Sequence, residues 1–170
     1  MSARLVLIAG LMAVLPSPVR AICYYKGKFS ATTTIAQEFY DARWVVRARV
    51  LSAHYNWSVG AGWTSYRLRV IRGYKGQMPA TFTFFTTRDS GGFYMDKGMT
   101  TPDRSQDYLL FLVPYPRNSD HPAESRGAYW VNYNCGRSQP WRQLTPGQRR
   151  QLEHLANRRQ AHPARTSQGN

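Results

Sequence analysis

The sequence predicts a mainly β protein: a small antiparallel barrel of five to six strands, with a short helix before it and another helix after it. Residues 44–53 and 66–76 alternate apolar and arginine side chains, which is typical of strands with one buried face. Residues 81–87 alternate threonine with phenylalanine, which favours a pleated sheet. Residues 107–115 are mostly apolar without alternation, which indicates a strand buried on both sides.

An immunoglobulin-like sandwich is the competing all-β architecture. That fold places a tryptophan between two cysteines of paired strands, whereas Cys23 comes before the first predicted strand. Short strands punctuated by glycine and proline therefore favour a closed or partly open barrel.

The N-terminal segment has the pattern of an export signal. Arg4 supplies a positive charge, residues 5–15 are apolar apart from one glycine, and Ala21 is a small residue at a suitable cleavage position. The apolar run is too short for a membrane span, which needs about 20 residues. We therefore predict a signal peptide over residues 1–21, a mature chain starting at Ile22, and an exported protein that is periplasmic or secreted.

The mature chain is strongly basic. Without Arg4 and Arg20 it has 21 lysines and arginines against nine acidic residues, a net charge of +12. Such an excess suits an anionic glycan, a lipid headgroup or an acidic protein as partner. An exported protein meets these partners more often than nucleic acid, so nucleic acid is not the expected ligand. An ordinary solvated basic surface is the alternative interpretation.

The chain contains two cysteines, Cys23 and Cys135. In an oxidising compartment such a pair predicts one disulfide, which would stabilise the fold by about 4–5 kcal/mol in the chain-entropy model. A redox role would require the two cysteines to be close in sequence, and 111 residues separate them.

Helices are expected on both sides of the strands. Thr34 and Gln37 have the spacing of a capping box, which predicts a short helix that ends by Arg43. Thr145, followed by proline and by Gln148, marks the start of the second helix. Residues 158–170 are polar and basic, so we predict a disordered tail after a single domain over residues 22–157.

The two arginine-bearing strands, residues 44–53 and 66–76, are expected to pair across the loop at residues 56–62. Pairing would gather basic side chains on one face and leave two tryptophans on the loop. Basic and aromatic side chains on one surface suit a ligand that is held by charge and by aromatic stacking. The candidate contact residues are Arg47, Arg49, Arg67, Arg69, Arg72, Lys75, Trp57 and Trp63.

Two shorter elements complete the predicted barrel. Residues 93–95 are a possible short strand, and residues 116–127 are a proline-bearing surface loop. Residues 128–134 are predicted as a last strand that ends at Cys135, with Tyr129, Val131 and Tyr133 on one face and Trp130 and Asn132 on the other.

Six segments, in this order, resemble the netrin-module superfamily. They are Trp-Val-Val-Arg-Ala-Arg-Val at 44–50, Tyr-Arg-Leu-Arg-Val at 66–70, Gly-Tyr-Lys-Gly at 73–76, Arg-Asp-Ser-Gly-Gly at 88–92, Asp-Tyr-Leu-Leu-Phe at 107–111 and Cys-Gly-Arg-Ser-Gln-Pro at 135–140. This superfamily is the OB-like barrel shared by tissue inhibitors of metalloproteinases and bacterial relatives of unknown role. The resemblance covers roughly residues 22–157 and implies an OB-like fold.

The resemblance also implies a second function, inhibition of a metalloprotease by the N-terminal segment. The residues concerned are Ile22, Cys23, Tyr24 and Tyr25. In the animal inhibitors the cysteine is itself the first residue and chelates the protease zinc, whereas here Ile22 precedes it. Members also tend to carry a cysteine where this chain has Phe93.

No catalytic motif is evident. His54 and Ser90 superficially resemble protease signatures, but the acid between them, Asp89, adjoins the serine and cannot orient the histidine. The four histidines show no metal-ligand spacing, and the carboxylates form no convincing acid–base pair. We therefore predict a non-enzymatic binding module without metal or cofactor, with protease inhibition as the alternative.

Overall fold

The structure is a computed structural model that describes residues 24–25, 28–29, 33–58, 62–88, 92–98, 100–116, 122–131 and 136–161. The predicted signal peptide, Ile22, Cys23, Cys135 and the end of the predicted tail lie outside these ranges. The disulfide between the two cysteines therefore stays a prediction.

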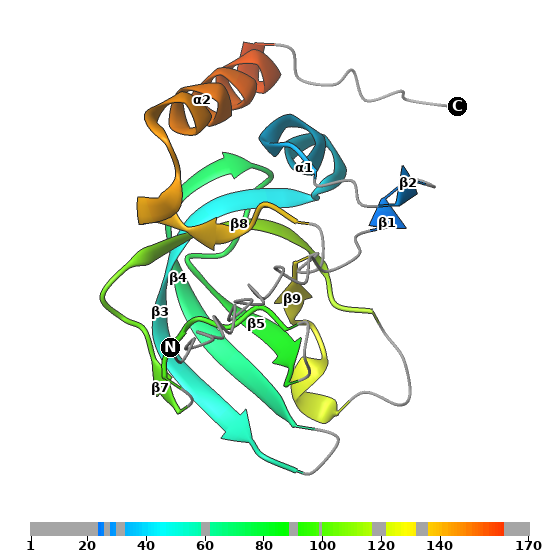
Figure 1. The fold of residues 1–170 in the computed structure, drawn as a ribbon, viewed down its shortest axis with the longest axis vertical. Helices are drawn as coiled ribbons and strands as arrows, with labels where there is room; N and C mark the ends of the chain where they lie inside the picture. The colour runs from blue at the N-terminus through cyan, green and yellow to red at the C-terminus, as the bar shows by residue number, and fades with distance from the viewer. Residues whose placement is uncertain are drawn as a thin grey trace, which may run out of the picture.

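A six-stranded sheet dominates the fold, in the order β10-β8-β3-β4-β5-β9. Strand β9 also pairs with β8, so that five strands form a nearly closed ring (Figure 1). Strands β5 and β9 are parallel, and the other pairs in this sheet are antiparallel. The strands are β3 (Trp44–Asn56), β4 (Trp63–Lys75), β5 (Thr81–Thr87), β8 (Asp107–Pro114), β9 (Tyr129–Trp130) and β10 (Gln139–Pro140).

The predicted pairing of the two arginine-bearing strands is confirmed. In the β3–β4 register Arg47 lies opposite Arg72, and Arg49 lies opposite Arg69. Both strands have 13 residues, because the hairpin continues to the pair Asn56–Trp63 and shortens the predicted loop. Three register shifts interrupt this ladder, and such bulges increase the bend and twist that closing a ring requires.

The two predicted helices are also present, as α1 (Ile35–Asp41) and α2 (Pro146–Ala161). Each has a reciprocal cap. Gln37 N donates to Thr34 Oγ1 at 3.2 Å, and Gln148 N donates to Thr145 Oγ1, also at 3.2 Å. Helix α2 includes residues 158–161, which were predicted to belong to the disordered tail. Its basic last turn complements the negative end of the helix dipole, which favours this extension.

The predicted strand at residues 93–95 does not form. Met95 is fully buried, its N–H donates to the Tyr66 hydroxyl and its carbonyl accepts from Asp103 N, so local contacts replace a strand ladder. Strands β6 (Asp96–Lys97) and β7 (Thr101–Pro102) follow as a separate pair. Of the predicted strand 128–134, β9 covers two residues, and residues 132–135 lie outside the described ranges.

The remaining short elements lie at the ends of the chain and in its loops. Strands β1 (Tyr24–Tyr25) and β2 (Lys28–Phe29) pair in a small sheet of their own. Two single-turn 3₁₀ helices, η1 (Ala123–Ser125) and η2 (Trp141–Gln143), precede β9 and α2, respectively.

The two larger hydrophobic cores of the described residues lie on opposite faces of the sheet. Inside the ring, side chains such as Val46, Leu68 and Phe84 are buried against one another. On the outer face, Val45 and Phe111 pack with residues of α1 and α2, and both helices cover one end of the ring (Figure 1). The helices do not cover the part of the outer face of β3 and β4 that carries the exposed side chains of Arg67 and Arg69.

Gly76 fixes the end of β4 with a φ of +71°. A Cβ atom there would lie 2.5 Å from Trp44 Cδ1, so we expect Gly76→Ala to lower the free energy of unfolding by about 2–3 kcal/mol. Gly127→Ala is the matched control, because Gly127 has the same φ but an added Cβ meets nothing within 4 Å. It should cost about 1 kcal/mol. Urea unfolding of both variants checks this, and equal losses would contradict the steric role of Trp44.

Candidate functional site

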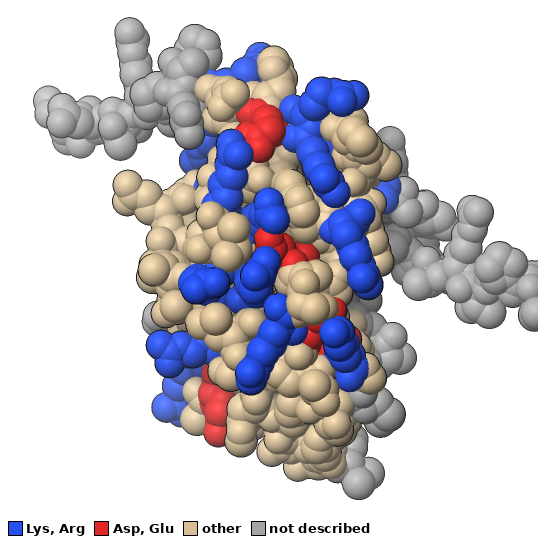
Figure 2. Space-filling view, turned by 90° about the vertical axis from the view of Figure 1, so that its left-hand side faces the viewer, with Lys and Arg blue, Asp and Glu red and all other residues tan. Residues whose placement is uncertain are grey.

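The outer face of β3 and β4 carries the arginines that the sequence predicts to point outward. The inward positions of these strands, including Val46, Ala48 and Leu68, fill the ring and leave the arginines on the other side. Figure 2 shows lysine and arginine side chains spread over the middle of the molecule, with fewer acidic side chains among them. We define the basic sheet face as Arg47, Arg49, Arg67, Arg69 and Arg72.

One buried carboxylate compensates part of the basic sheet face. Asp107 lies opposite Arg49 at the start of β8, and its side chain is 2% exposed. Its two oxygens accept hydrogen bonds from Arg47 Nε and Arg49 Nε, each at 2.6 Å. These two arginines are 32% and 41% exposed and are therefore held by the sheet while remaining partly accessible.

The edge of the basic sheet face near α2 is joined to that helix. Arg72 forms an ion pair with Glu153 and lies 5.1 Å from the centre of the Tyr74 ring. Tyr74 stacks on Trp141, and the Arg47 guanidinium lies 4.7 Å from the Trp141 ring centre. Arg72 therefore connects the sheet to α2 and Arg47 connects it to η2, and both also contribute positive charge.

Arg67 and Arg69 differ from these arginines. Both are exposed, and within the described ranges neither takes part in an ion pair. In the sheet register Arg67 lies between Ser52 and Thr83, while Arg69 lies between Arg49 and Thr81. The centre of the basic sheet face is therefore a row of accessible guanidinium groups bordered by hydroxyl groups.

Lys75 and Trp63 do not join this surface. Lys75 Nζ donates to the carbonyl oxygens of Phe39 and Tyr40 at 2.7 and 2.8 Å, so it caps the end of α1. Trp63 is only 7% exposed and packs against Phe85, so it is not part of the accessible surface. It points outward from β4, but the segments around Ala128 and Tyr115 cover it.

Trp57 is 48% exposed at the end of the β3–β4 hairpin, but it belongs to a different cluster. Its ring lies 4.6 Å from the Arg88 guanidinium, which also contacts the rings of Tyr55 and Tyr94 at 5.0 and 4.8 Å. Arg88 in turn pairs with Asp96, whose side chain is 2% exposed. Three aromatic rings from two segments therefore lie around a nearly buried ion pair.

Hydrogen bonds complete this cluster. Tyr55 Oη donates to Asp96 at 2.8 Å, and Arg88 Nε donates to the Thr64 hydroxyl at 2.5 Å. Burial raises the pKa of Tyr55, and the hydrogen bond to Asp96 raises it further. Burial likewise raises the pKa of Tyr66, with a further contribution from Asp96. Both phenols therefore remain protonated donors near neutral pH, which fits a structural role for the cluster.

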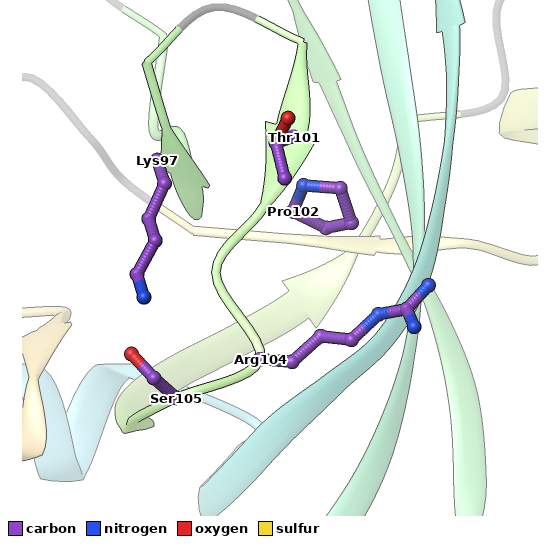
Figure 3. Close-up of a pocket in the computed structure, with 5 residues that line it drawn as sticks. All are labelled: Lys97, Thr101, Pro102, Arg104 and Ser105. Carbon is purple, nitrogen blue, oxygen red and sulfur yellow. The ribbon is translucent and has the colours of Figure 1, made fainter.

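A second feature of the surface is a hollow of about 550 Å³ beside β7 (Figure 3). Lys97 and Ser105 point toward one another across it, whereas the Arg104 side chain extends away toward the strands of the sheet. The neighbouring Asp103 is buried. Burial alone would raise its pKa, but hydrogen bonds from Ser105 and Gln106 outweigh this effect and hold the pKa below its usual range. Asp103 is thus a structural acceptor.

Of the residues considered for catalysis, the structure describes only His54. His54 is exposed on β3 with its ring 5.4 Å from that of Trp63, and Asp89 and Ser90 lie outside the described ranges. Within those ranges, no group of three histidine, cysteine, aspartate or glutamate residues could hold a metal ion.

The N-terminal segment that would contact a metalloprotease is described only as the backbone of Tyr24 and Tyr25 in β1, so inhibition stays a prediction. In the part of the chain that the structure describes, no helix is both long and apolar enough to cross a membrane. A scan against protein-family models and a search of curated proteins find no match to this chain.

Proposed function

We propose that this protein is an exported, non-enzymatic binding module that holds an anionic polymer, such as an acidic glycan, on its basic sheet face. The observation that carries the proposal is the exposure of Arg67 and Arg69 beside Arg49, without an acidic partner for Arg67 or Arg69 among the described residues. Arginines placed side by side repel one another, and a bound polyanion would relieve this repulsion.

The strand connections support an OB-like barrel of the netrin-module type. Numbered 1 to 5 in chain order, the ring strands are β3, β4, β5, β8 and β9, and their order around the ring is 1-2-3-5-4. Strands 3 and 5, which are β5 and β9, pair in parallel. OB-type barrels bind oligosaccharides or oligonucleotides on the face of the second and third strands. Here these strands are β4 and β5, which carry Arg67, Arg69, Thr81 and Thr83.

The spacing of the charges suits an extended polymer. Alternate residues of a strand lie about 7 Å apart and neighbouring strands about 5 Å apart, so Arg49, Arg67 and Arg69 form a compact row. Guanidinium groups bind sulfate and carboxylate groups through two parallel hydrogen bonds. The hydroxyl groups of Ser52, Thr81 and Thr83 can add neutral hydrogen bonds to the same ligand.

Heparin-affinity chromatography tests the proposal. The Arg67→Ser/Arg69→Ser variant should elute at clearly lower salt than the wild type, because it loses the two exposed charges of the site. Arg126→Ser/Arg150→Ser is the matched control. It removes the same charge from two exposed positions outside the basic sheet face, on the turn after η1 and on α2.

The control variant should elute close to the wild type. An equal shift for both double variants would mean that overall charge, and not the basic sheet face, governs retention. A wild-type protein that is not retained at low salt would contradict an acidic glycan as the ligand and favour an acidic protein.

A further inference from the structure

The structure contains a second basic surface with a different chemistry, a hollow of about 260 Å³ where α1, β4 and α2 meet. The two helices lie side by side over one end of the ring (Figure 1). We call this hollow the helix groove; it is lined by Phe39, Tyr40, Lys75, Leu155, Arg158 and Arg159. We propose that the helix groove binds the headgroup of an anionic phospholipid at a membrane surface.

The floor of the helix groove is apolar. Phe39 and Leu155 are 2% and 7% exposed and belong to the outer hydrophobic core. Tyr40 stands beside them and is 65% exposed, with its ring edge-on to that of Phe39. An exposed tyrosine has an apolar ring and a polar hydroxyl, which suits the boundary between acyl chains and water.

The rim of the helix groove is cationic. Lys75 is fixed by its hydrogen bonds to the end of α1, and Arg158 and Arg159 are exposed on the last turns of α2. Burial lowers the pKa of Lys75, and Arg159 lowers it further, while Asp41 opposes these effects. Both residues line the same hollow, so two like charges face it. In the described part of the chain, neither Arg158 nor Arg159 forms an ion pair.

A phospholipid satisfies both features together. Its phosphate matches the three basic side chains, and its glycerol and first methylene groups can cover the exposed Tyr40 ring above Phe39 and Leu155. A sulfated polymer has no apolar part for this floor. Because the hollow is smaller than the roughly 300 Å³ at which pockets for whole drug-sized ligands begin, the acyl chains would remain in the bilayer. Long arginine side chains can reach the phosphates from the helix surface.

Sedimentation with vesicles of phosphatidylcholine and phosphatidylglycerol tests this site. Arg158→Ser/Arg159→Ser should weaken binding about 25-fold, because each basic residue near an anionic membrane contributes about a fivefold gain in affinity. Tyr40→Ser should weaken binding roughly threefold without loss of charge. These positions are exposed, and circular dichroism verifies that each variant is folded.

Arg67→Ser/Arg69→Ser is the matched control, because it removes two charges from the basic sheet face and should change vesicle binding less than about twofold. An equal loss in this control would overturn the assignment to the helix groove, as would unchanged binding by Tyr40→Ser. Equal binding to pure phosphatidylcholine vesicles would exclude the anionic headgroup. Competition by glycerol phosphate alone would indicate a simple phosphate site. Heparin retention is scored separately, so failure of this inference leaves the polymer-binding proposal standing.

Discussion

Asp96→Asn is expected to lower the free energy of unfolding by about 3–4 kcal/mol, within the range found when one partner of a buried ion pair is removed. The substitution keeps the shape of the side chain but removes the negative charge beside Arg88, whose side chain is 11% exposed. The aromatic rings of Tyr55, Trp57 and Tyr94 contact the same guanidinium but cannot replace a carboxylate. Urea unfolding at neutral pH measures the loss.

Asp103→Asn is the matched control for the Asp96→Asn substitution. Asp103 is also buried, but its cationic neighbour Lys97 lies 3.9 Å away and is 63% exposed, so we expect a loss of about 1–2 kcal/mol. The pKa of Asp103 is lower in the folded protein than in the unfolded chain, where it is near 3.8. Its contribution to the free energy of unfolding is therefore present above the unfolded pKa and is lost as the pH falls through the folded pKa. A loss for Asp96→Asn no larger than this control would contradict the buried ion pair.

Asp107→Asn is expected to change stability and ligand binding in opposite directions. The free energy of unfolding should fall by about 2–3 kcal/mol, less than for Asp96→Asn, because Arg47 and Arg49 are 32% and 41% exposed and water can solvate them. Heparin retention should increase, because two guanidinium groups lose their carboxylate partner and become available to a polyanion.

Urea unfolding and elution from heparin measure these two effects on the same preparation. Weaker retention of folded Asp107→Asn would contradict direct competition between Asp107 and the ligand. It would mean instead that Asp107 is needed to hold Arg49 in a binding geometry.

Much of the fold could be predicted from local sequence patterns. Alternation at a period of two identifies β3 and β4 because one face of each strand meets the ring interior and the other does not. The reciprocal caps at Thr34 and Thr145 mark both helix starts, since a cap depends on residues only three positions apart.

The neighbours of the arginines could not be predicted in this way. Asp107 reaches Arg47 and Arg49 across 60 and 58 residues of sequence, because β8 returns to pair with β3. Trp63 faces outward but is buried, since the chain after β8 folds back over it. Local alternation gives the direction of a side chain within its sheet, whereas its burial depends on which distant segment covers that face.

The salt dependence of binding to a heparin oligosaccharide tests the role of Arg67 and Arg69 most directly. Isothermal titration calorimetry at several salt concentrations gives the slope of the logarithm of the binding constant against the logarithm of the salt concentration. Each charge contact contributes about one to the magnitude of that slope. We expect Arg67→Ser/Arg69→Ser to reduce the magnitude of the slope by about two, and Arg126→Ser/Arg150→Ser to leave it unchanged. The same slope for the wild type and Arg67→Ser/Arg69→Ser would contradict the proposal that the basic sheet face holds the polymer.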